Sequence, residues 1–154
     1  MKFAIIGTGI MGCGWITQCA MTGQEVHCYD ANPDILAGVR ATCENLTRKA
    51  AKKFKTADPD IVLNTDNNIN VYEDKGSFVA AAGACDIFLE VIFEDLKLKC
   101  SVLSELLPQL PENVIFWSNT SGLDINPLAA AGGRAERSIV CHGMNPVPLM
   151  PGVE

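Results

Sequence analysis

The last thirteen residues join an imidazole to a carboxylate through a proline-rich loop. His142 begins this segment and Glu154 ends it, with prolines at positions 146, 148 and 151 between them. Each proline fixes its φ angle at about −65° and removes an amide donor, so we expect no helix here and few conformers. A histidine oriented by a carboxylate is a typical general base. The alternative is an ordinary exit loop, in which His142 binds a backbone carbonyl and Glu154 faces water.

A glycine-rich loop near the amino terminus has the spacing of a phosphate-binding turn. Residues 7–12 read Gly-Thr-Gly-Ile-Met-Gly, between an apolar run and a helical pattern. In such a loop the first glycine makes the tight turn, the second lets a pyrophosphate approach the backbone, and the third lets helix and strand pack closely. The helix N-terminus then faces the anion. The predicted cofactor-binding residues of this loop are Gly7, Gly9, Ile10, Met11 and Gly12.

The next apolar run ends in an acid, Asp30, within the expected distance of about twenty residues. A carboxylate at this place accepts hydrogen bonds from the adenosine ribose. Residues 31 and 32 are alanine and asparagine, so a 2′-phosphate would meet an anion without a cation, and we predict NAD rather than NADP. The alternative is a glycine turn that only packs strand on helix, with Asp30 as a cap.

Short apolar runs alternate with helical patterns along the chain. The predicted strands cover residues 2–6, 25–30, 86–91, 114–119 and 138–142, with a weaker candidate at 68–72. The predicted helices cover residues 11–21, 33–55, 76–82, 96–107 and 125–131, and residues 56–70 are predicted to be a linker or loop. This alternation predicts an α/β fold: a Rossmann-type, doubly wound, mainly parallel sheet with helices on both faces. We expect one dinucleotide-binding domain over residues 1–154.

Composition excludes several classes of protein. Apolar residues make up 48% of the chain and charged residues 19%, which is typical of a globular domain. The net charge of −6 argues against a nucleic-acid partner. The sequence has no run of about eighteen apolar residues, the length needed to cross a membrane. The seven cysteines are odd in number and lack C-x-x-C spacing, so we predict neither disulfides nor a metal site and expect a reducing cytoplasm.

Polar residues also end three other predicted strands, at the edge where open α/β sheets bind ligands. They read Glu-Val-Ile-Phe-Glu-Asp-Leu-Lys-Leu-Lys at 90–99, Ser-Asn-Thr-Ser-Gly at 118–122 and Cys-His at 141–142. With the glycine loop and the Asn-Pro-Val-Pro tail, these segments resemble, in this order, the short-chain L-3-hydroxyacyl-CoA dehydrogenase family. The resemblance is to its N-terminal NAD-binding domain and extends from residue 2 to residue 154.

The resemblance implies an NAD-dependent enzyme that oxidises a 3-hydroxyacyl substrate to the 3-keto product. The favoured substrate is a 3-hydroxyacyl-CoA, a compound of fatty acid metabolism. His142 would take the hydroxyl proton, Glu154 would hold its imidazole, and Ser121 would bind the substrate oxygen. The usual histidine pKa of about 6.5 suits proton transfer in both directions. Without the resemblance, Ser121 is equally consistent with an ST-turn or a helix cap.

Further contacts follow from the same resemblance. Asn119 would contact the nicotinamide side of the cofactor, and Glu94 and Lys99 would form a cofactor-contacting pair. Taken alone, that pair is consistent with the solvated start and flank of a helix. The implied substrate-binding residues are Ser121, Asn145, Lys52 and Asn45. The last two belong to a basic helix that would attract coenzyme A phosphates, although such a face is also an ordinary solubilising feature.

Three features depart from the family pattern. Gly122 stands where acyl-CoA enzymes commonly have a second serine, and Gly143-Met144 where they commonly have two aromatic residues. Both changes keep open a non-CoA hydroxy acid of carnitine or sugar-acid type. The family's catalytic asparagine and its helical, dimerising C-terminal domain have no counterpart here. We therefore expect the N-terminal domain of a larger homodimeric protein, weakly active alone, or a non-catalytic NAD-binding fragment.

Overall fold

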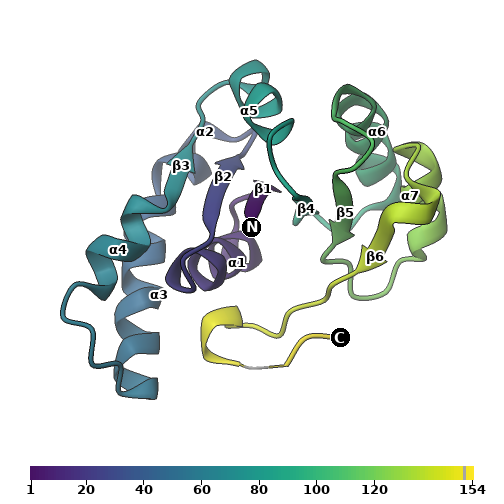
Figure 1. Cartoon of the computed structure of the whole chain (residues 1–154). Helices are drawn as coiled ribbons and strands as arrows, with labels where there is room; N and C mark the ends of the chain where they lie inside the picture. The colour runs from purple at the N-terminus through teal and green to yellow at the C-terminus, as the bar shows by residue number, and fades with distance from the viewer. Residues whose placement is uncertain (151) are drawn as a thin grey trace.

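The structure is a computed structural model that describes residues 1–150 and 152–154. A single six-stranded sheet forms its centre, with strand order β3-β2-β1-β4-β5-β6 (Figure 1). Every neighbouring pair of strands is parallel. The strands are β1 (Lys2–Ile6), β2 (Glu25–Tyr29), β3 (Ile69–Val71), β4 (Ile87–Glu90), β5 (Ile115–Ser118) and β6 (Ser138–Val140). The predicted Rossmann-type α/β fold is confirmed.

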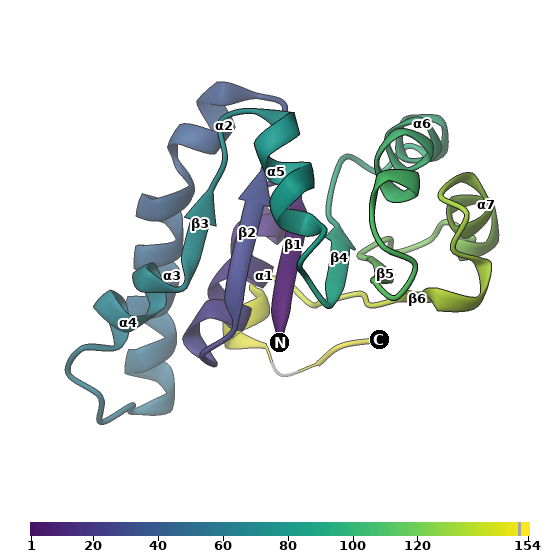
Figure 2. The same ribbon diagram turned by 45° about the horizontal axis from the view of Figure 1, so that its top comes forward.

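Helices cover the sheet from two sides, as the turned view shows (Figure 2). The α-helices are α1 (Ile10–Met21), α2 (Pro33–Ala37), α3 (Val39–Phe54), α4 (Ile61–Asn67), α5 (Lys75–Ala82), α6 (Leu96–Leu106) and α7 (Ile125–Ala131). Short 3-10 helices follow at Leu107–Gln109, Ala135–Arg137 and Val147–Leu149. Among the described residues, no helix has the length and apolar character needed to span a membrane.

Two apolar cores lie on opposite faces of the sheet, because successive side chains of a strand alternate in direction. Phe3 and Ile5 pack in one core with residues of α1 and α3. Ala4 and Ile6 pack in the other with residues of α5, α6 and α7. Strands buried on both faces read as continuous apolar runs, which is why the sequence revealed them.

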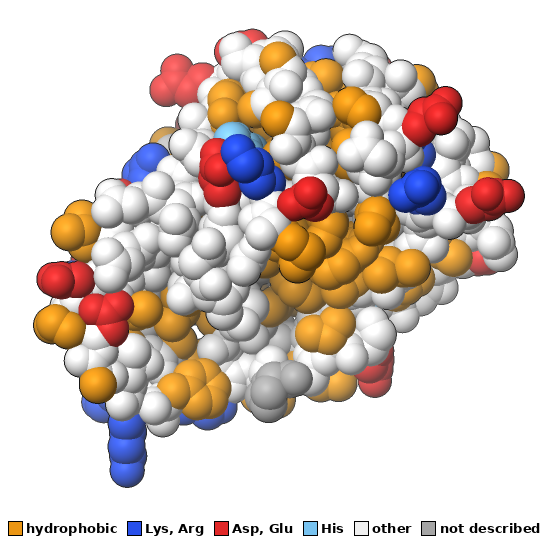
Figure 3. Space-filling view, viewed as in Figure 1, with side chains coloured by type: hydrophobic (Ala, Val, Ile, Leu, Met, Phe, Trp, Pro, Cys, Tyr) orange, Lys and Arg blue, Asp and Glu red, His pale blue; other side chains and the backbone are white. Residues whose placement is uncertain are grey.

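One part of the sheet keeps an open apolar face. Ile115 of β5 and Ile139 of β6 are exposed, and Trp117 between them is half-buried. Figure 3 shows the resulting apolar area over β4 to β6 on the face nearest the viewer.

The helical region after Asp30 is not the single helix predicted for residues 33–55. It breaks at Gly38, which ends α2 and precedes the first residue of α3. Glycine weakens a helix because it has the most backbone freedom to lose. The predicted start is correct: the Asn32 side chain accepts from the Asp34 amide at 3.0 Å, with Pro33 at the first helical position.

The prediction of a loop over residues 56–70 is wrong in its second half, where α4 forms. Arg40 of α3 fastens this helix, with its guanidinium 2.5 Å from Asp66 and 3.0 Å from the Ile69 carbonyl. Within α4, the Thr65 hydroxyl donates to the Ile61 carbonyl at 2.6 Å. Contacts with α3 thus stabilise a seven-residue segment that is too short to form a stable helix on its own.

The tail after β6 also differs from prediction, since Val147–Leu149 is a 3-10 helix. Pro148 lies in its first turn, where the missing amide would have no helical partner in any case. The strand itself ends at Val140, two residues before the predicted end. Pro151, the third proline of the tail, lies outside the described residues.

Candidate cofactor and catalytic site

A cavity of about 800 Å³ opens at the carboxyl ends of the strands, the edge where open α/β sheets bind ligands. The glycine loop, the ends of β4 and β5 and the segment after β6 all border it. The predicted site residues that line it are Gly7, Gly9, Ile10, Met11, Asp30, Glu94, Asn119, Ser121, His142 and Asn145. Residues far apart in sequence are therefore gathered at one sheet edge.

The glycine loop has the geometry of a phosphate turn. Gly7 has φ of 92°, and a Cβ there would lie 2.5 Å from the Val91 carbonyl oxygen, so only glycine fits. A Cβ at Gly12 would lie 2.0 Å from the Gly7 carbonyl oxygen, so Gly12 lets α1 close onto the loop. At Gly9 a Cβ would meet no protein atom within 4 Å. The fold therefore explains the first and third glycines, and only a ligand would need the second.

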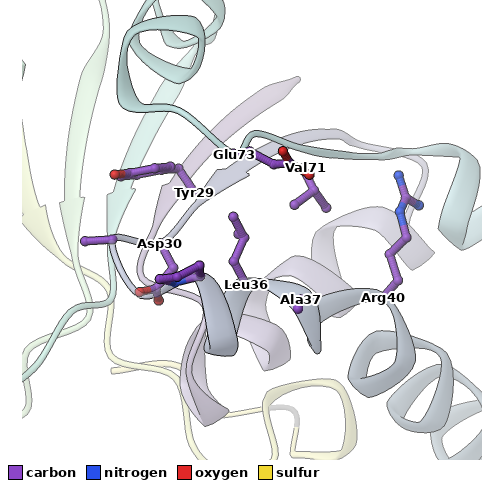
Figure 4. A pocket seen from close by; sticks show the side chains of 9 residues that line it. Tyr29, Asp30, Leu36, Ala37, Arg40, Val71 and Glu73 are labelled. Atoms are coloured by element: carbon purple, nitrogen blue, oxygen red, sulfur yellow. The ribbon is translucent and has the colours of Figure 1, made fainter.

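Asp30 is held rigidly at the end of β2. One carboxylate oxygen accepts from the Thr8 amide at 2.7 Å and from its hydroxyl at 3.3 Å, and the other accepts from the Asn32 amide at 2.9 Å. Asp30 borders the main cavity and also a second cavity of about 790 Å³ beside α2. Figure 4 shows this second cavity, with Asp30 at one end, Arg40 at the other and Leu36 between them. The bonds of Arg40 to α4 and β3 keep its guanidinium away from Asp30.

Behind the main cavity, two acids and a lysine form a buried charge network. Lys99 is 1% exposed and Glu90 is 0% exposed, and their side chains approach to 2.6 Å. The same Lys99 ammonium lies 3.1 Å from Glu94. Glu90 also accepts from the Ser118 hydroxyl at 2.7 Å and from the Ile92 amide at 2.8 Å. Lys99 is thus enclosed by protein and does not line the cavity, in contrast to the solvated helix flank considered from sequence.

Glu94 connects this network to the serine loop, the segment with Thr120 and Ser121 that follows β5. One of its oxygens accepts from the Thr120 hydroxyl at 2.5 Å and from the Ser121 amide at 3.0 Å. Burial acts to raise the pKa of Glu94, but the bonds from Thr120, Lys99 and Ser121 outweigh it, so this pKa lies below its usual range. The side-chain turn considered for Ser121 forms instead at Thr120, whose hydroxyl accepts from the Leu123 amide at 3.0 Å, and the helix that follows is capped by Asp124.

His142 and Glu154 face each other across a short antiparallel pairing. Two backbone hydrogen bonds of 2.9 Å join them, one in each direction. The His142 Nδ1 atom lies 3.6 Å from a Glu154 carboxylate oxygen, which is too long for a hydrogen bond and close enough for ionic attraction. Because Nδ1 faces Glu154 while the ring borders the cavity, Nε2 is the nitrogen available to a ligand.

The two residues predicted to contact coenzyme A are not brought to the cavity. Asn45 and Lys52 are both exposed on α3. They are seven positions apart, so they lie on the same face of the helix, and neither lines the cavity. The neighbouring Lys53 instead donates to the Leu149 carbonyl of the tail at 2.5 Å. Residues that the sequence did not single out include Thr120 and Ser118, whose short polar side chains gave no signal on their own.

The described residues hold no cluster of three or more His, Cys, Asp or Glu side chains suited to a metal ion. All seven cysteines are free, and six of them are buried. Burial raises the pKa of Cys19 and Cys28 to about 12, so both are neutral packing groups.

The parallel sheet, the glycine turn before α1 and the acid that ends β2 define a Rossmann-type dinucleotide-binding domain. The sequence matches the family described as 3-hydroxyacyl-CoA dehydrogenase, NAD binding domain, over residues 2–154, and the chain belongs to that family. The family resemblance and the NAD cofactor predicted from sequence are confirmed.

Known relatives share this domain. The chain is 38% identical over 154 residues to the mitochondrial hydroxyacyl-coenzyme A dehydrogenase of Sus scrofa, covering 97% of this chain and 48% of that protein. A solved (S)-3-hydroxybutyryl-CoA dehydrogenase from Ralstonia eutropha is 31% identical, with a TM-score of 0.88 over 99% of this chain and 52% of that one. A solved diketoreductase is 26% identical, with a TM-score of 0.89 over 99% of this chain and 53% of that one. The chain thus spans about half the length of these proteins.

Proposed function

We propose that this chain supplies the cofactor site and the general base for NAD-dependent oxidation of a 3-hydroxyacyl-CoA to the 3-keto product. One observation carries the proposal: His142, Ser121 and Asn119 border the same cavity as the phosphate turn. A base, a hydroxyl and a dinucleotide site in one cavity are the parts that alcohol oxidation by hydride transfer requires.

The cofactor would lie along the carboxyl edge of the sheet. The pyrophosphate would meet the N-terminus of α1, and Asp30 would accept from the adenosine ribose. Its position between the two cavities supports this role, with adenosine on the α2 side. The Asp30 charge would repel the 2′-phosphate of NADP. Arg40 would not offset this repulsion, because its guanidinium is bound to Asp66. Asn119 would contact the nicotinamide half, and Glu94 the cofactor, with buried Lys99 acting through Glu94.

Proton removal would fall to His142. NAD, when bound, accepts the hydride from the carbon that carries the hydroxyl. His142 Nε2 takes the hydroxyl proton, Glu154 stabilises the resulting imidazolium through Nδ1, and Ser121 holds the substrate oxygen. Asn145, at the same cavity, would contact the substrate.

A CoA thioester is the substrate class that the named relatives support. Exposed Lys52 and Asn45 on α3 would then meet its phosphates. A non-CoA hydroxy or keto acid is the second candidate, favoured by Gly122 and Gly143 and by the likeness to a diketoreductase. For the whole protein, we propose dimerisation through a C-terminal domain and a place in the cytoplasm, where seven free thiols would stay reduced.

Turnover in a protein that carries this chain and the family's C-terminal domain tests the proposal. NADH oxidation with acetoacetyl-CoA should exceed that with carnitine-type or simple keto acids. His142→Asn should lower kcat by about 100-fold or more while NADH binding stays unchanged. Equal kcat in the variant would reject the general-base role. Faster turnover of a non-CoA substrate would select the second candidate.

A further inference from the structure

Trp15 reaches the site from inside the first helix. Its ring is 5% exposed, and its indole nitrogen donates to the Asn119 side-chain oxygen at 2.7 Å. Buried tryptophans need a partner for this N–H, and here the partner lies 104 positions away at the end of β5. Asn119 itself borders the main cavity. The contact thus joins an interior side chain to a residue that borders the cavity.

A second donor binds the same oxygen of Asn119. The Gly143 amide, directly after His142, donates to Oδ1 at 3.0 Å. An indole N–H and a backbone amide are donors only, so together they fix which end of the Asn119 amide points inward. Its oxygen faces the two donors, and its NH2 group is turned away from them. Within residues 1–150 and 152–154, no hydrogen bond uses that NH2 group.

Trp15 and Gly143 also depend on each other sterically. A Cβ at Gly143 would lie 2.9 Å from the Trp15 Cζ2 atom and 3.0 Å from a Val147 methyl carbon. A larger residue at position 143 would displace the indole and break its bond to Asn119. Gly143, where aromatic residues are common in acyl-CoA enzymes, therefore leaves the space that the large Trp15 side chain fills.

We propose that Trp15 is a positioning residue: it orients Asn119 so that the Asn119 NH2 group faces the cavity and donates to an oxygen of the nicotinamide half of NAD. The same oxygen of Asn119 anchors the loop that carries His142. This inference rests on the proposed cofactor site. It adds to that site an orienting residue, Trp15, that touches neither cofactor nor substrate. It also requires that the Asn119 NH2 group, and not the side-chain oxygen, face the cavity.

A double-mutant cycle on NADH binding separates orientation from packing. Trp15→Phe keeps an aromatic ring and removes the N–H, and should weaken NADH binding by about 2- to 10-fold. Asn119→Ala should weaken it at least as much, and adding Trp15→Phe to Asn119→Ala should change nothing more. Trp117→Phe is the matched control: Trp117 of β5 packs on Phe3 of β1, so this substitution should leave NADH affinity unchanged. Additive effects of the two substitutions would overturn the proposal.

Asn119→Asp tests the polarity directly. Aspartate keeps an acceptor for both inward donors but cannot donate to the cavity, so NADH affinity should fall by at least the Asn119→Ala factor while thermal stability changes little. Wild-type affinity in Asn119→Asp would contradict the outward donor.

A cofactor-free measurement keeps the inference distinct from the proposed function. In the free protein, hydrogen exchange of the Trp15 indole N–H should accelerate in Asn119→Ala and stay slow in His142→Asn. If the wild type failed to bind NADH, the proposed function would fail, while this exchange would still report the orientation. Unchanged exchange in Asn119→Ala would reject the Trp15–Asn119 bond itself.

Discussion

The Lys99 ammonium lies 2.6 Å from a Glu90 carboxylate oxygen, with both side chains out of reach of water. A buried ion pair is stable only if the remaining hydrogen-bonding positions of both charged groups also have partners. Ser118, Ile92 and Glu94 supply those remaining contacts. The network fixes Glu94, and Glu94 in turn fixes the serine loop at the cavity.

Removing the cation should be more harmful than removing one anion. Lys99→Met leaves Glu90 charged, buried and near Glu94, and should lower the free energy of unfolding by about 3–5 kcal/mol. Glu90→Gln leaves Lys99 paired with Glu94 and should lower it by about 1–3 kcal/mol. Urea unfolding of each variant measures both values.

The control for this comparison is an exposed ion pair. Arg48 and Glu44 approach to 2.6 Å on the surface of α3, with side chains 64% and 50% exposed. Arg48→Met should therefore change the unfolding free energy by less than about 1 kcal/mol. A Lys99→Met effect as small as that of Arg48→Met would show that the buried network is not important for stability.

Two glycines of the phosphate turn should respond differently to alanine. Gly12→Ala places a methyl group 2.0 Å from the Gly7 carbonyl oxygen and must move α1, so it should destabilise the fold by at least about 2 kcal/mol. Gly9→Ala meets no protein atom within 4 Å and should leave stability within about 0.5 kcal/mol.

The Gly9 methyl group would instead occupy space needed by the pyrophosphate. Calorimetry should show NADH affinity reduced about tenfold or more in Gly9→Ala, although the protein is fully folded. Normal NADH affinity in this variant would argue against a phosphate site at the loop.

Glu94 should contribute to acid sensitivity. Its folded pKa lies below the usual range, so its contribution to stability is present above the unfolded pKa of about 4.3 and disappears as the pH falls through the folded pKa. Thr120→Val removes one bond to the carboxylate and should raise this pKa toward its usual value. An NMR titration of the Glu94 carboxyl group measures the shift, and equal pKa values in both proteins would refute the assigned cause.

Much of the fold could be predicted because its signals are local. Apolar runs at the strands, the glycines at positions 7, 9 and 12 and the Asn32 cap each depend on neighbouring residues alone. Helix α4 was missed because Arg40, more than twenty positions earlier, holds it in place through Asp66. The pair of Glu90 and Lys99 was missed for the same reason: its burial exists only after β4 and α6 pack together.

The site residues divide in the same way, into those with a local sequence signal and those that depend on distant contacts. Those at strand ends, such as Asn119 and His142, were predictable because parallel strands share one carboxyl edge. The link from Trp15 to Asn119 spans 104 positions and depends on the small residue at position 143, which no local pattern reveals.

Calorimetric titration of NADH into this chain and into its Asp30→Ala variant tests the central claim most directly. The claim is that the sheet edge holds the cofactor between the glycine turn and Asp30. We predict saturable binding at one site in the wild type and affinity at least about tenfold weaker in Asp30→Ala. No measurable heat at millimolar NADH, or equal affinity in the two proteins, would contradict it.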